Sequence, residues 1–232
     1  MSDRPPAPAL AGTDLALGGN LLTAAIRRDI ADLNRLFLQC ALEPGFGSDP
    51  WFCLPARAVG RLASAPPQAR ERVAQSPFTL FELCLPEPAD RPGWRPAAVA
   101  DAQDTEPGLR ANADARRAFA LIALGVARRL AEGAPMCPRI AFGVGAEAET
   151  RLSGLSPAES FGVASWPGLV RPRWPRHERY WCMLAAAACS EDDQILRWAF
   201  ATGLCLTPSG DRAVPCTDAP TVRRRARAVP AR

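Results

Sequence analysis

Arginines and aromatic residues alternate along segment 171–181. Its four arginines, two tryptophans and one tyrosine are Arg171, Arg173, Arg176, Arg179, Trp174, Trp181 and Tyr180. Guanidinium groups neutralise phosphates, and aromatic rings stack on bases or pack beneath a partner. The pattern predicts a contact surface for a partner protein or DNA, formed by Arg171, Arg173, Trp174, Arg176, Arg179 and Trp181. In the alternative interpretation, the tryptophans anchor the start of a helix, and the arginines lie in water with their stems over the rings.

The histidine and cysteine content does not favour a catalytic or metal centre. His177 is the only histidine, lies among arginines and is expected to be solvated. Cys182 follows at a spacing that points to another helix face, so His177 has no nucleophile to activate. The eight cysteines form no C-x-x-C pair and mostly have aliphatic neighbours, which is typical of small buried residues. We therefore expect no enzymatic activity, no metal and no cofactor.

The stretch Gly143-Val-Gly-Ala-Glu-Ala148 fits the G-x-G-x-x-A pattern of a dinucleotide phosphate loop. Such a loop needs a strand before the glycines and a long helix after them, with its N-terminus facing the pyrophosphate. Residues Ile140-Ala-Phe142 offer at most a stub of strand, and the helix that follows breaks between Gly154 and Pro157. The other strands of a parallel sheet are missing. We expect a tight turn into a short helix instead.

Apolar residues recur at helical spacing through most of the chain, which predicts an all-α fold with short extended segments. The first half is expected to hold a long helix over 20–42, short helices starting at Pro55 and at Pro66-Pro67, and a buried extended segment over 78–85. The second half is expected to hold a long helix over 113–132, a short helix capped by Ser156, and helices over 175–189 and 191–204, the last capped by Ser190.

The two halves repeat one order of signals. Residues 52–84 align without a gap with residues 142–174 at an offset of 90, and Pro67 and Pro77 fall on Pro157 and Pro167. Because one unit is small for a stable core, the two units are expected to pack on each other. The predicted organisation is a flexible arm over 1–19, helical unit 1 over 20–85, a Pro-rich linker over 86–112, helical unit 2 with two extra helices over 113–206, and a disordered Arg-rich tail over 207–232.

The second unit resembles FlhD, the small helical subunit of a bacterial flagellar transcription activator. The resemblance lies in the order of Phe142-Gly-Val-Gly145, Thr150-Arg-Leu-Ser-Gly-Leu-Ser156 and Leu169-Val-Arg-Pro-Arg-Trp174. The first unit matches less well because Cys53-Leu-Pro55 lacks the glycine, and the linker and last two helices depart from that family. The resemblance implies a non-enzymatic protein that acts on DNA with a partner subunit, in which two fused units imitate the family's dimer.

Charge and hydropathy narrow the choice of partners. Residues 1–116 hold 12 arginines and 14 acidic residues, whereas residues 117–232 hold 16 and 10, so the second half is basic. The longest apolar run, Ala118–Ala127, is too short for a membrane span, and a secretory signal is not seen, so we expect a cytoplasmic protein. The leading prediction is a transcription regulator that binds a protein partner, with DNA as a second candidate ligand. The alternative is an adaptor or accessory factor of a secretion or motility apparatus without DNA contact; the sequence leaves the oligomeric state open.

Overall fold

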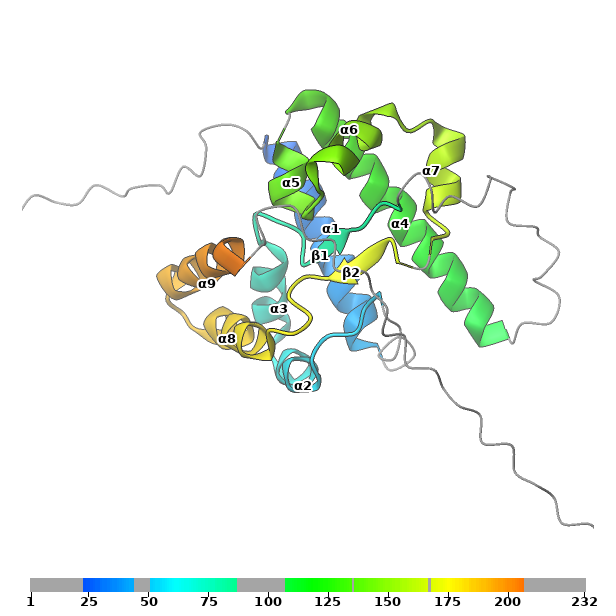
Figure 1. The fold of residues 1–232 in the computed structure, drawn as a ribbon. Coiled ribbons are helices and arrows are strands. Elements are labelled where there is room, and N and C mark those ends of the chain that lie inside the picture. Colours follow the sequence, from blue (N-terminus) through cyan, green and yellow to red (C-terminus); the bar gives the residue numbers. More distant parts are fainter. Residues whose placement is uncertain (1–22, 44–50, 87–106, 135, 167, 207–232) are drawn as a thin grey trace, which may run out of the picture.

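The computed structural model describes residues 23–43, 51–86, 107–134, 136–166 and 168–206 (Figure 1). Within these ranges the chain is mostly helical with one short pair of strands, which confirms the predicted all-α class. The elements follow in the order α1 (Ala24–Leu42), α2 (Ala56–Ser64), α3 (Pro67–Ala74), β1 (Phe81–Leu83), α4 (Pro107–Gly133), α5 (Cys137–Phe142), α6 (Ala146–Gly154), α7 (Pro157–Val163), β2 (Val170–Pro172), α8 (Glu178–Cys189) and α9 (Asp193–Leu206). The predicted arm, the tail and most of the linker lie outside the described residues.

Helix α1 is the long helix of the first unit. Thr23 caps it, because its hydroxyl oxygen accepts the backbone N–H of Ile26 at 3.3 Å. Ile30, Leu33 and Phe37 recur at three- and four-residue steps and are buried. Helix α1 packs on α3 and α4, and the Phe37 ring of the apolar stripe lies 6.5 Å from that of Phe119 on α4. The periodicity seen in the sequence therefore marks the face that α1 buries.

A buried asparagine, Asn34, fixes the path from α3 to β1. Its amide nitrogen donates to the carbonyls of Ala74 and Phe78 at 3.1 and 2.9 Å, and its side-chain oxygen accepts the N–H of Leu80 at 2.8 Å. These bonds satisfy the buried amide, so its burial carries little penalty. Asn34 therefore determines where the chain leaves α3 and enters the strand.

Helix α4 starts earlier than the sequence predicts. The expected start was Ala113, but the helix begins at Pro107 and so takes in the end of the predicted linker. Proline suits the first turn because the N–H it lacks would have no partner inside the helix. A Pro- and Gly-containing composition therefore concealed the first turns. Helix α4 packs on α1 and on α6.

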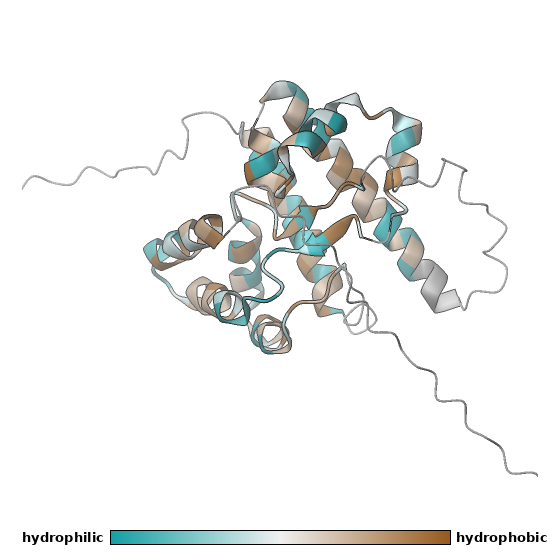
Figure 2. Cartoon of the chain, in the orientation of Figure 1, coloured by the Kyte–Doolittle hydropathy of each residue, from teal (hydrophilic) through white to brown (hydrophobic). Residues whose placement is uncertain are grey.

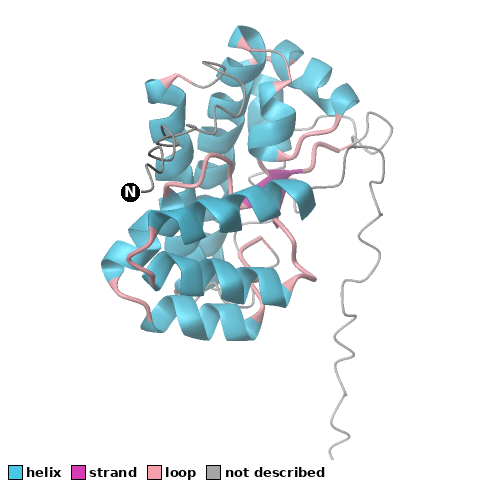
Figure 3. Ribbon diagram, turned by 90° about the vertical axis from the view of Figure 1, so that its left-hand side faces the viewer, coloured by secondary structure: helices cyan, strands magenta, loops and turns pink. Residues whose placement is uncertain are grey.

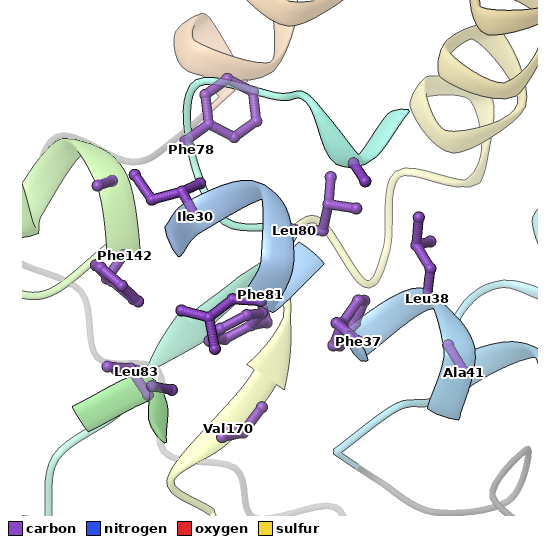
Figure 4. Close-up of a cluster of buried hydrophobic side chains, with 14 of the residues drawn as sticks. Ile30, Phe37, Leu38, Ala41, Phe78, Leu80, Phe81, Leu83, Phe142 and Val170 are labelled. Carbon is purple, nitrogen blue, oxygen red and sulfur yellow. The ribbon is translucent and has the colours of Figure 1, made fainter. Parts of the chain in front are cut away.

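Strands β1 and β2 join the two units. They pair antiparallel, with Phe81 opposite Pro172 and Leu83 opposite Val170. Figure 3 shows helices surrounding this strand pair, and Figure 4 shows Phe81 in the buried cluster, its ring 5.5 Å from that of Phe37. Buried residues of both units belong to one continuous core, so the units pack on each other as predicted.

The order of elements repeats at the predicted offset. Helix α2 and helix α6 begin at Ala56 and Ala146, and α3 and α7 begin at Pro67 and Pro157. Equivalent positions share their burial, as Leu62 and Leu152 do. The packing is not identical, because α1 contacts mainly α3, whereas α4 contacts mainly α6. The two units are therefore alike in order and different in detail.

The caps of α7 and α9 and the segment before Gly143 were each predicted from the sequence. The capping box of Ser156 and Glu159 at α7 is confirmed. The stub of strand before Gly143 is instead helix α5, which ends at Gly143 with a φ of 65° and turns tightly into α6, as expected for that glycine pair. The cap of α9 is also corrected: Asp192 accepts the N–H of Gln194 at 2.8 Å, while Ser190 ends α8.

Cysteine burial differs from the prediction. Among the described cysteines only Cys137 is buried, while Cys53, Cys189 and Cys205 are exposed. Aliphatic neighbours in the sequence do not fix the helix face on which a residue lies, so they do not predict burial. The expectation that these cysteines are mostly buried is therefore wrong for the described part of the chain.

Candidate functional site

Segment 171–181 leaves β2, turns and enters α8. Arg171 lies on β2, and its Nη2 atom is 2.6 Å from Oε2 of Glu82, the residue opposite it on β1. Glu82 is largely buried, so this cross-strand ion pair is better shielded from water than a surface pair. Arg171 therefore links the two units, with its guanidinium already held by a carboxylate of its own chain.

Arg173 is fully buried, with 0% of its surface exposed. Its Nη2 atom donates to the carbonyl of Ile140 at 2.9 Å, and its Cζ atom lies 5.2 Å from the ring centre of Phe78 and 5.7 Å from that of Trp174. No described residue accepts a hydrogen bond from Nε or Nη1. The charge is thus held mainly by one carbonyl and two aromatic faces.

Burial has a direct electrostatic effect on Arg173. It lowers the pKa of the guanidinium to about 10, and the negative charge of Glu82 offsets part of that change. The group stays protonated at neutral pH, because a pKa of about 10 lies well above 7. Arg173 is therefore a buried cation that no described carboxylate pairs with directly.

The two tryptophans of the segment are structural. Trp174 has a φ of 52°, in the left-handed region that disfavours large side chains, and its buried ring packs 4.5 Å from that of Tyr180. Trp181 is fully buried and donates from Nε1 to the carbonyl of Arg173 at 3.0 Å. Their packing holds the turn between β2 and α8 in place, as the alternative interpretation of the sequence expected.

The predicted contact surface is therefore divided. Arg173, Trp174 and Trp181 are enclosed in the core and are not available to a partner in this structure, which corrects that part of the prediction. Neither interpretation anticipated a buried Arg173. Arg176 and Arg179 are exposed, and so is His177, as predicted.

Arg176 and Arg179 meet a third arginine that the sequence did not reveal. Arg57 of α2 borders, together with them, a shallow depression of about 390 Å³ at the start of α8. The side chain of Arg57 is 84% exposed, and its Nε atom lies 3.4 Å from Oε1 of Glu178. We call Arg57, Arg176 and Arg179 the α8 basic surface. Arg57 was missed because only the packing of α2 on α8 brings it to the segment.

Helix α9 carries an exposed apolar face. Trp198 is 67% exposed and Ile195 is 47% exposed, and Cys205 lies on the same side of the helix. In Figure 1, α9 lies at the edge of the molecule, and in Figure 2 it changes from teal at its acidic start to brown towards its end. We call Ile195, Trp198 and Cys205 the α9 apolar face.

The opposite side of α9 packs on α8. Gly203 of α9 lies against the hydroxyl of Tyr180, and Phe200 packs edge-on against Phe78 at 6.1 Å. Burial raises the pKa of the Tyr180 phenol, and the charge of Arg173 opposes that change. This packing fixes which face of α9 points outward.

In the described part of the chain, no group of three or more histidine, cysteine or acidic side chains is arranged to hold a metal ion. None of the described helices has both the length and the apolarity needed to cross a bilayer. The chain matches no known family model, no curated protein and no solved structure.

Proposed function

We propose that this chain is a non-enzymatic regulatory protein that acts by binding a protein partner through the α9 apolar face. The observation that carries the proposal is the exposure of Trp198 at the middle of α9. Tryptophan is enriched among the residues that dominate binding energy at protein interfaces. Scattered single apolar residues are ordinary on a surface, but Ile195, Trp198 and Cys205 share one helix face.

The occupant we propose is an amphipathic helix of a partner protein. Helix α9 has 14 residues, so its length is about 21 Å, and a face about 10 Å wide offers on the order of 200 Å². A stable pair of copies usually buries about 800 Å² on each side, which the α9 apolar face alone does not supply. A single helix laid along α9 fits this area, with acidic residues beside its apolar stripe to face the exposed Arg197.

The resemblance to FlhD supports the regulatory part of this proposal, since it implies a protein that works with a partner subunit on DNA. The alternative is an adaptor or accessory factor that uses the same partner surface without touching DNA. Both hypotheses share the protein partner. They differ in whether the chain also binds nucleic acid.

Partner binding is tested by affinity capture with the Trp198→Ala variant from nuclease-treated lysate of cells that normally make the protein. We expect a partner that copurifies with the wild type and binds Trp198→Ala about thirtyfold more weakly, since loss of an interface tryptophan typically costs about 2 kcal/mol. The purified pair is then measured by titration calorimetry.

The matched control is Ile122→Ala on α4, where the replaced side chain is 51% exposed. It should bind the partner as the wild type does, and both variants should unfold at the wild-type temperature. Equal binding by Trp198→Ala and wild type would contradict the proposal.

A further inference from the structure

We infer that the α8 basic surface is a phosphodiester-binding site for duplex DNA. This deepens the proposed function, because it selects the regulator over the adaptor; the regulatory role rests on that proposal, whereas the binding itself does not. The inference stands on three arginines from two elements that border one depression. Arg57 comes from α2, and Arg176 and Arg179 flank the start of α8.

The geometry at the start of α8 suits an anion. His177 caps the helix without a side-chain hydrogen bond, and no described residue accepts from the backbone N–H groups of Glu178 and Arg179. These N–H groups lie at the positive end of a twelve-residue helix. Phosphate oxygens would accept hydrogen bonds from these N–H groups and from the guanidinium groups beside them.

The local charge balance is positive. Three arginines face one acid, Glu178, whose carboxylate contacts Arg57 at 3.4 Å. An incoming phosphate would compete with Glu178 for Arg57. Glu178 is therefore expected to weaken binding, although it lies within the site.

A second arginine group in the structure provides a contrast. A depression of about 630 Å³ beside α1 is bordered by Arg27, Arg28 and Arg35. There Arg35 is held by Asp32 at 2.5 Å and by Glu71 at 2.7 Å, and this hydrogen bonding lowers the pKa of Glu71 to about 2. Arg35, neutralised in this way, offers less to a phosphate, and Arg27 and Arg28 lie on α1, away from the α8 basic surface. This group supplies a control with the same kind of side chain.

The test measures binding of the full chain to a fluorescent mixed-sequence DNA duplex by anisotropy across a series of salt concentrations. We expect binding that weakens steeply with salt, because phosphate contacts release counterions. The double variant Arg176→Ala/Arg179→Ala should reduce the slope of log K against log salt by about 2, since each lost phosphate contact removes about 0.9. Glu178→Gln should bind several-fold more tightly.

The control double variant Arg27→Ala/Arg28→Ala removes the same net charge elsewhere and should keep most of the affinity. Equal losses in the two double variants would show that overall charge, including the C-terminal arginines, accounts for binding, and would overturn the site. Failure of the wild type to bind duplex DNA at low salt would also overturn it, as would weaker binding by Glu178→Gln. Trp198→Ala should keep DNA binding and Arg176→Ala/Arg179→Ala should keep the protein partner, so the two proposals fail separately.

Discussion

Arg173 is part of the packed interior of the protein and does not form a surface for a partner. Its backbone N–H donates to Leu80 of the first unit at 2.9 Å, and its carbonyl accepts the indole of Trp181 at 3.0 Å. The backbone thus ties β1, β2 and α8 together, while the guanidinium lies among aromatic rings. Burying a charge without a carboxylate partner is costly in free energy. The backbone hydrogen bonds of Arg173 therefore stabilise the fold, whereas its buried charge destabilises it.

Replacing Arg173 separates these two effects. Arg173→Met removes the charge and keeps a long flexible side chain, so we expect unfolding in urea at the wild-type concentration or above it. Arg173→Ala should lose about 3 kcal/mol, because it also leaves a cavity. Should Arg173→Met be destabilised as much as Arg173→Ala, the charge itself would be stabilising through Phe78 and Trp174, contrary to this account.

Residue types alone could not predict which side chains of segment 171–181 are buried and which are exposed. Arginine is rarely buried, so solvation was the reasonable expectation for all four arginines. It was right for Arg176 and Arg179 and wrong for Arg173. The difference arises from tertiary structure: Phe78, far away in the sequence, supplies one of the rings that enclose the guanidinium.

At the scale of elements, helices α8 and α9 form a hairpin held from both sides. Arg72 of α3 donates to the carbonyls of Ala188 at 2.8 Å and of Ser190, and contacts Asp193 at 2.7 Å. Its guanidinium thus binds the turn between the two helices. At the other end, the close approach of Gly203 to Tyr180 sets how α9 lies on α8.

Gly203→Ala tests that close approach. An added methyl group would overlap the Tyr180 hydroxyl and lie 3.1 Å from Cζ of Phe78, so we expect a loss of about 1–3 kcal/mol in thermal unfolding. Gly125→Ala on α4 is the matched control, since nothing lies within 4 Å of its added methyl group, and it should gain about 0.5–1 kcal/mol from helix propensity. A neutral Gly203→Ala would mean that α9 shifts freely on α8.

Helices with strong local signals were predicted well. The capping box at Ser156 and the prolines that begin α3 and α7 act within one helical turn. The local sequence is therefore enough to predict these helix starts. The start of α4 at Pro107 and the whole of α5 were missed. Helix α5 is short, and its place depends on contacts with α4 and β1 that no local pattern encodes.

At the scale of the molecule, the repeat explains how a chain with a Pro-rich middle forms one core. Each unit contributes one strand to the β1–β2 pair, and α1 packs on α4. The repeat led to the expectation that the two units pack on each other, but not that β1 pairs with β2 or that α1 packs on α4. It did not predict that α8 would pack on α2 and α3 of the first unit. That packing brings Arg57 to the α8 basic surface, so one of its three arginines could not be predicted from the sequence.

The most direct test of the central claim, that the α9 apolar face binds a protein partner, is site-specific photocross-linking in cells that normally make the protein. A photoreactive amino acid is placed at position 198, and separately at position 122 on α4 as the control. The account predicts one protein joined at position 198 in nuclease-treated samples and absent at position 122. No cross-linked protein at position 198, or the same products at both positions, would contradict it.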